Sequence, residues 1–211
     1  IDDKLFFRLA GSFIDSEGFF TNETRDEKMF PRTEKNIRGR LIWEPSPDFQ
    51  ADFRVNLKDN EQGGIQWKPQ SAIPGIQTSP QAAVLDINRI DEQPWVRNVE
   101  SFSEHVEEQF TLKLKYNLGP VELQSVTNYD SADDEWRSDD FPYARGLNGT
   151  QFNLFSQESI STELRIQSPP DQRLTYTVGV YLADIENSPD DITAEGVDDT
   201  GTGRVLDGTT P

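Results

Sequence analysis

The amino-acid sequence predicts an all-β fold in which about seven antiparallel strands follow one another up and down a single sheet. Two observations lead to this prediction. Seven segments alternate apolar and polar residues with the period of two that a half-buried strand shows, not the 3.6 of a helix. Short turns and long connections alternate between these segments, and strands joined by tight turns are antiparallel neighbours. All short turns are therefore expected at one end of the sheet.

The clearest alternation lies between Ile37 and Leu57, which we interpret as two strands joined by a turn at 45–48. One face of this hairpin is apolar and the other is charged. A charged side chain cannot sit in a packed core without a partner, so the two faces need different surroundings. The apolar face carries Ile37, Gly39, Leu41, Trp43, Phe49, Ala51, Phe53, Val55 and Leu57, and the charged face carries Arg38, Arg40, Asp52, Arg54, Asn56 and Lys58.

The same pattern predicts the other elements. Further strands are expected at 4–14, 110–116, 121–129, 160–167 and 173–186, with short turns at 117–120 and 168–171. Long loops are expected near 15–33, 60–106, 133–156 and 188–211. Within the second loop, Ser79 and Pro80 suit the N-cap and first position of a short helix.

Composition limits the function classes. The 211 residues carry a formal net charge of −18, which disfavours nucleic-acid partners because phosphate binding needs clustered Lys and Arg. The chain has no cysteine, so it can form neither a disulfide nor a thiolate zinc site. Hydrophobic residues make up only 34%, but they are concentrated in the alternating strands, which argues against disorder.

Strict alternation of short turns and long loops is typical of transmembrane β-barrels, whose strands alternate lipid-facing apolar residues with polar residues that face the lumen. Aromatic residues close to the ends of the apolar faces suit the interfacial girdles of such barrels. These residues are Phe13, Trp43, Phe49, Tyr116 and Tyr129. The alternative is a soluble sandwich whose core ends in the same aromatic residues.

An open sheet of seven strands would leave two unpaired edges, which are costly in hydrocarbon. The polar face also carries more charges than a narrow barrel of eight strands would easily pair. We therefore expect residues 1–211 to form part of one larger barrel domain, with the missing strands before Ile1 and after Pro211.

Four segments resemble the barrel region of TonB-dependent outer-membrane receptors. Residues 8–22 resemble a strand followed by that family's Asp-Gly-Tyr/Phe-x-x-Asn loop, with Glu17 at the usual Asp. Residues 40–46, RLIWEPS, resemble its R-x-x-L-x-W-x-P-S turn, and residues 123–129, LQSVTNY, its L-x-S-x-T-x-Y strand. Residues 161–169, STELRIQSP, and the later 178–181, VGVY, are similar to its S-x-E-L-R-L-x-S-P and G-x-Y-Y motifs.

This resemblance implies a barrel of about 22 strands in the bacterial outer membrane. It implies active uptake of a scarce nutrient, of the siderophore-iron, cobalamin or glycan class, with energy supplied by TonB through a plug domain. Neither a plug nor a TonB box is found in these residues. The implied partners are outer-membrane lipid and lipopolysaccharide, a small-molecule or glycan ligand, and TonB.

Aromatic and polar residues of the long loops would lie at the outer mouth of such a barrel, where a ligand is captured. The candidates are Trp67, Trp95, Trp136, Asp139, Asp140 and Tyr143. Ordinary loop packing is the alternative role for each. The rival function is a secreted β-sandwich that binds carbohydrate through exposed Trp67, Trp95 and Trp136.

The sequence does not suggest an enzyme. His105 is the only histidine and is interpreted as a solvated residue at a loop edge, and no nucleophile elbow or triad can be composed around it. No cofactor is expected. The acidic stretches 133–135, 139–140, 190–191 and 198–199 could bind Ca²⁺, alone or as a bridge to lipopolysaccharide, but they lack EF-hand spacing, and solvated loops are the simpler interpretation.

Overall fold

The computed structural model describes residues 3–64, 94–97, 100–139, 150–197 and 203–206, and every regular element there is a β-strand. In these ranges no helix has the length and apolar character needed to cross a membrane. The expected helix after Ser79 falls outside the described residues, as do Trp67, Asp140 and Tyr143.

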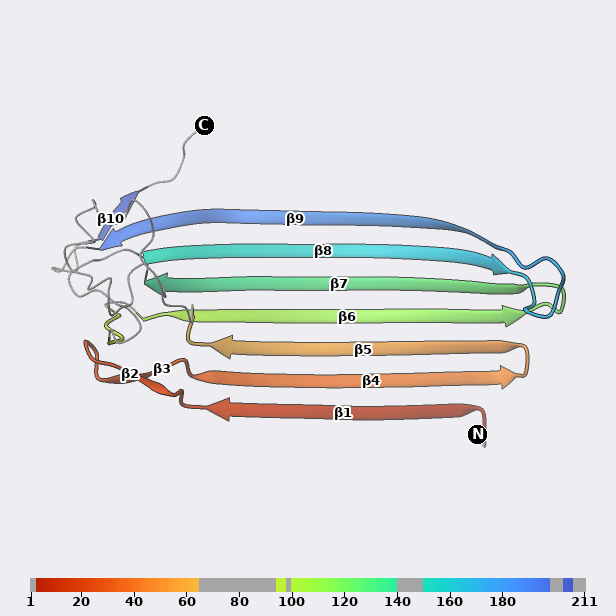
Figure 1. The fold of residues 1–211 in the computed structure, drawn as a ribbon, viewed down its shortest axis with the longest axis horizontal. Coiled ribbons are helices and arrows are strands. Elements are labelled where there is room, and N and C mark those ends of the chain that lie inside the picture. Colours follow the sequence, from red (N-terminus) through yellow and green to blue (C-terminus); the bar gives the residue numbers. More distant parts are fainter. Residues whose placement is uncertain (1–2, 65–93, 98–99, 140–149, 198–202, 207–211) are drawn as a thin grey trace.

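The main sheet has the strand order β1-β4-β5-β6-β7-β8-β9-β10, and each strand pairs antiparallel with its neighbours (Figure 1). Its strands are β1 Leu5–Ser16, β4 Arg32–Ser46, β5 Phe49–Gln62, β6 Phe102–Asn117, β7 Glu122–Asp139, β8 Thr150–Gln167, β9 Thr177–Val197 and β10 Gly203–Leu206. The sheet is open, since β1 and β10 are its two edges. The predicted antiparallel order of seven long strands is confirmed, and β10 adds a short eighth.

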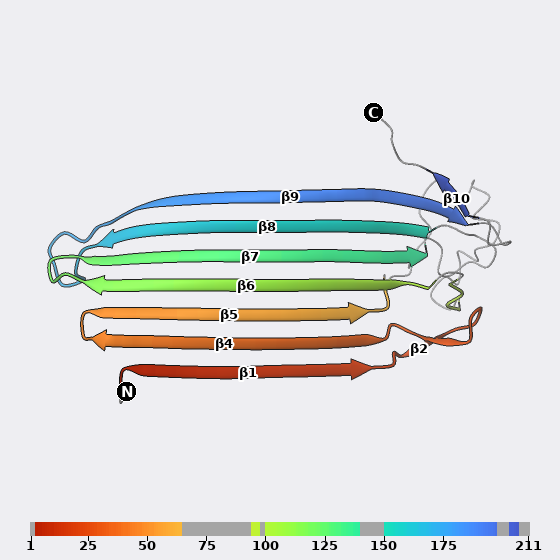
Figure 2. The same cartoon turned by 180° about the vertical axis from the view of Figure 1, so that it is seen from behind.

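The short connections lie together at one end of the sheet, and the strand ends that the longer connections join lie at the other, as expected (Figures 1 and 2). Residues 47–48 join β4 to β5, and residues 118–121 join β6 to β7. In the second turn the Asn117 side chain accepts a hydrogen bond from the Gly119 amide at 2.8 Å. The third connection, 168–176, is longer than the predicted turn at 168–171, because β9 begins only at Thr177.

Part of the expected loop at 15–33 forms a small hairpin of β2 Phe20–Asn22 and β3 Glu27–Met29. Gly18 allows the chain to turn into it: its φ is 98°, and a Cβ there would lie 1.9 Å from the Met29 carbonyl oxygen. β1 also extends to Ser16 and β4 begins at Arg32, so the loop prediction was wrong for ten residues of this segment.

Two further loop predictions were wrong over most of their length. β7 continues through 133–139 and β8 begins at Thr150, so only 140–149 separates them, and β9 extends to Val197. The backbone ladder holds these residues in strands. The same pairing places His105 inside β6, opposite Asn60 and Asp134, and not at a loop edge.

The sheet is a single layer, and no other described element crosses it in Figure 1 or Figure 2. Among the described residues the only buried hydrophobic side chains are Met29, Phe30 and Val96, which lie outside the long strands. Both faces of the long strands are therefore open.

Candidate functional site

The registers divide the sheet into an apolar face and a polar face, and confirm the alternation read from the sequence. Phe53 of β5 lies opposite Leu41 of β4 and Leu112 of β6, all on the apolar face. Asp52, one residue earlier, lies opposite Ile42 and Lys113 on the polar face. The predicted sets hold: Phe53, Val55, Leu112, Leu114, Val178 and Val180 share the first face, and Arg54, Lys113, Glu163 and Arg165 share the second.

The apolar face is exposed from one side of the sheet to the other. Phe7 of β1 is 82% exposed, Leu164 of β8 52% and Val178 of β9 63%. These side chains come from strands that are far apart in the sheet order, so the exposure is not confined to its edges. A surface of this extent is rare on a soluble monomer and indicates an apolar environment or partner.

Two short rows of aromatic side chains, each covering three neighbouring strands, lie on the apolar face. Trp43, Phe49 and Tyr116 form the first row beside the short turns, with ring centroids 5.9 and 6.2 Å apart. The second row runs from Phe53 to Phe110 at 6.5 Å and on to Tyr129 at 6.2 Å. Tyr116 lies six positions after Phe110 on β6, and Leu112 and Leu114 lie between them on the same face.

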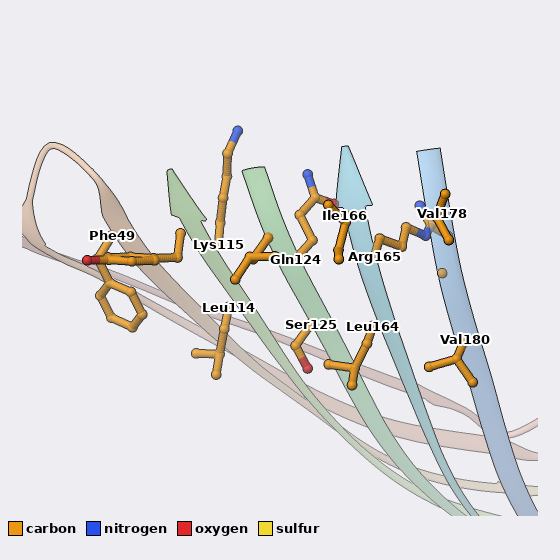
Figure 3. Close-up of a pocket in the computed structure, with 13 residues that line it drawn as sticks. Phe49, Leu114, Lys115, Gln124, Ser125, Leu164, Arg165, Ile166, Val178 and Val180 are labelled. Atoms are coloured by element: carbon orange, nitrogen blue, oxygen red, sulfur yellow. The ribbon is translucent and has the colours of Figure 1, made fainter. Parts of the chain in front are cut away.

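Between β5 and β9 the apolar face has a shallow hollow of about 640 Å³. Figure 3 shows Leu114 and Lys115, neighbours on β6, pointing to opposite sides of the sheet. The hollow itself has an aliphatic and aromatic lining. Its residues include Phe49, Leu114, Tyr116, Leu123, Leu164, Ile166, Val178 and Val180.

On the polar face the buried carboxylate of Asp52 joins two arginines. Arg40 donates to its two oxygens at 2.9 and 2.8 Å, and Arg54 donates to the same oxygens at 3.2 and 2.7 Å. The Asp52 side chain is 6% exposed, whereas those of Arg40 and Arg54 are 45% and 43% exposed. Two bidentate contacts supply hydrogen-bond donors to both oxygens of Asp52. The sequence indicated that this carboxylate needs a partner but did not identify one.

On β6 and β7 the polar face carries acidic side chains, and hydrogen bonds join side chains of the two strands. Gln109 donates to Asp130 at 2.6 Å, and the Thr111 hydroxyl donates to Asn128 at 2.6 Å. On the same face His105 Nδ1 lies 2.7 Å from an Asp134 oxygen. On β8, Arg165 donates to Glu163 at 2.6 Å.

The apolar face changes character along β6 and β7, whereas on β1 it stays apolar as far as Phe13. We call the part beside the short turns the turn-side half and the part beside the long connections the loop-side half. On β6, Leu112 and Leu114 of the turn-side half give way to Glu104 and Glu108 on the same face of the loop-side half. Asp133, Glu135 and Glu158 occupy that face of β7 and β8. The strands therefore continue beyond their apolar section.

Trp95, a predicted ligand residue, packs in a cluster beside the small hairpin. Its ring centroid lies 4.9 Å from Phe30 and 5.8 Å from Phe20, and the Arg97 guanidinium stacks over Phe30 at 4.7 Å. The Asn22 side chain donates to the Arg97 carbonyl at 3.0 Å. The sequence search missed Phe20, Phe30 and Arg97, because no periodic pattern links them to Trp95.

The other predicted ligand residues do not gather into one described site. Trp136 lies within β7, opposite Ser103 and Asn153, and not in a loop. Asp139 ends β7. Since Trp67, Asp140 and Tyr143 lie outside the described residues, ligand capture by the group as a whole stays a prediction.

In the described part of the chain, no three His, Asp or Glu side chains are arranged to hold a metal ion. The side chains at 139–140, 190–191 and 198–199 are not described, so Ca²⁺ binding there also stays a prediction.

Beside a short turn, a 2.6 Å ion pair with Lys115 lowers the pKa of Glu122 below its ordinary value.

The chain matches no protein-family model and no solved structure.

Proposed function

We propose that this chain forms part of the wall of an outer-membrane β-barrel receptor, which takes up a scarce nutrient with energy supplied by TonB. The observation that carries the proposal is the single-layer sheet, exposed and apolar on one face and charged on the other. Lipid would cover the first face and a water-filled lumen would solvate the second. The family and its energy coupling rest on the sequence resemblance.

The dimensions of the apolar section support a membrane-spanning wall. The separation of six positions from Phe110 to Tyr116 corresponds to about 20 Å along a strand, and barrels carry an apolar band about 25 Å tall between aromatic girdles. On β5 the apolar face runs from Phe49 to Leu57, nine residues, close to the roughly 9–11 of a transmembrane strand. The two aromatic rows would then lie at the two interfaces, and acyl chains would fill the hollow of Figure 3.

The charged face supports a wide lumen. Asp52, Arg40 and Arg54 satisfy one another and leave the guanidinium groups partly exposed, which suits contact with water more than a narrow, dry interior. The open edge at β1 needs a further strand in hydrocarbon, because each unpaired backbone group there costs several kcal/mol. A larger barrel, of the roughly 22 strands that the resemblance implies, would supply it.

In this orientation the long connections face outward. Ligand capture is assigned to them and to the adjoining end of β7, with Trp67, Asp140 and Tyr143 as candidates in the connections and Trp136 and Asp139 as candidates in β7. The acidic loop-side half would lie among lipopolysaccharide headgroups. Replacing 65–93 or 140–149 with a short Gly/Ser linker keeps every described strand. Whole-cell uptake should fall in at least one replacement, and unchanged uptake in both would remove these segments from ligand capture.

The rival secreted sandwich needs a second sheet over the apolar face. The second sheet in the described residues, β2 with β3, has only three residues in each strand and is separate from the main sheet. Trp95 is held in the aromatic cluster, so it is not a free carbohydrate platform. These observations favour the membrane wall.

Fractionation of cells that produce the complete protein containing this chain tests the proposal. It should sediment with outer membranes, require detergent for extraction, and migrate differently on gels before and after boiling. Recovery from the soluble fraction without detergent, together with glycan binding, would overturn the receptor and support the sandwich.

A further inference from the structure

Cationic side chains gather on the polar face of β1, β4 and β5, with one from β6, although the chain as a whole carries a formal charge of −18. We call this group the arginine band. It consists of Arg8, Arg38, Arg40, Arg54 and Lys113, and they line a hollow of about 570 Å³. Asp52 is the one carboxylate among them, so the band has a formal charge of +4.

The register places like charges directly against one another. Arg8 lies opposite Arg40, and Arg40 lies opposite Arg54, so three guanidinium groups follow one another across three strands. Like charges at directly opposite positions destabilise a sheet. Asp52 offsets only part of this repulsion, since it contacts Arg40 and Arg54 but not Arg8.

Three acids on the polar face of β6, β7 and β8 already have partners. Glu107 lies 3.5 Å from Lys58, Asp130 accepts from Gln109, and Glu163 accepts from Arg165. No ion pair of Arg8 or Lys113 is formed within the described ranges, and both residues are exposed. The band therefore has unused cationic donors facing the hollow.

We propose that the arginine band binds a small oxyanion, so that the nutrient taken up carries carboxylate or phosphate groups. This proposal rests on the proposed function, in which the polar face lines the lumen. Guanidinium forks match the two oxygens of a carboxylate or phosphate, and the hollow falls within the roughly 300–1,000 Å³ of small-molecule sites. Asn56, Gln109 and Thr111 supply neutral hydrogen-bonding groups at the same hollow.

Calorimetric titration of the complete protein in neutral detergent tests the proposal, with citrate and inorganic phosphate as probes and uncharged glycerol as the reference. The variants are Arg8→Gln, Lys113→Gln and the double variant, none of which disturbs the contacts of Asp52. Arg25→Gln is the matched control, because it removes the same charge from the connection between β2 and β3, where Arg25 pairs with Glu27.

We expect saturable binding of citrate or phosphate that weakens about tenfold in each single variant, since one charge-assisted contact is lost. Binding should weaken with added salt, Arg8→Lys should retain more of it than Arg8→Gln, and the control should stay within about twofold of wild type. A preference for citrate over phosphate, or the reverse, identifies the oxyanion class.

Absence of saturable binding up to about 10 mM would overturn the proposal, as would equal affinities in wild type and the double variant. The first result is expected if an acidic protein surface already covers the band. In either case fractionation still measures whether the protein lies in the outer membrane. Failure of oxyanion binding is therefore distinguishable from failure of the proposed function.

Discussion

The turn-side and loop-side halves of the long strands share one backbone ladder but differ in what their side chains meet. On β6, Leu112 and Leu114 expose an apolar surface in the first half, and Glu104 and Glu108 expose charges on the same face of the second. Strand formation therefore continues where amphipathic alternation ends. If the first half spans a membrane and the second extends into water, identical substitutions should have very different costs in the two halves.

The largest expected effect is a charge in the turn-side apolar face. Leu114→Arg should lower the free energy of unfolding of the complete protein in lipid by about 2–4 kcal/mol, the cost of Arg or Lys near the midplane of a barrel wall. Lys113→Leu, on the next residue and the opposite face, should cost far less. Equal losses in equilibrium unfolding would contradict the assignment of the two faces.

Trp95→Ala tests whether the loop-side end has a packed cluster of its own. Trp95 is only partly buried against Phe20 and Phe30, so we expect a local loss of about 2 kcal/mol, below the 3–5 of a fully buried aromatic residue. Hydrogen exchange of the β2–β3 amides should accelerate while that of β6 does not. Unchanged exchange with reduced ligand uptake would instead support the ligand-binding role.

Val106→Arg repeats the Leu114 experiment in the loop-side half of the same strand. Val106 and Leu114 lie on one face of β6, so the two variants differ in their level along the strand and not in side-chain direction. Outside hydrocarbon the cost should fall to about 0–1 kcal/mol. A loss as large as that of Leu114→Arg would place both halves in the same environment.

The smallest effect concerns acid stability at the short turns. Lys115 lowers the pKa of Glu122 in the folded protein, so the pair stabilises the fold above the unfolded value near 4.5 and loses that contribution as pH falls through the folded pKa. For a pair this exposed the gain is below about 1 kcal/mol. Glu122→Gln should flatten the acid limb of the plot of unfolding free energy against pH, and an unchanged plot would contradict this role of the pair.

The sequence alone was sufficient for the turn-side half. The alternation from Phe49 to Leu57 predicted the strand, its two faces and its neighbours, because burying one face against an apolar medium requires a period of two. The short turns at 47–48 and 118–121 followed from Pro, Asn and Gly at fixed places. The charges of Arg40, Asp52 and Arg54 predicted a need for partners.

Only the tertiary structure identified those partners and extended the strands. Asp52 meets Arg40 because the β4–β5 register brings them across the turn, a relation fixed by backbone pairing and not by local sequence. Residues 133–139 and 188–197 lie in strands because neighbouring backbones pair there. The acidic stretch 133–135 carries no apolar alternation from which a strand could be predicted. Hydrophobic periodicity records which side chains must leave water, whereas the hydrogen-bond ladder depends on strands brought together from distant parts of the chain.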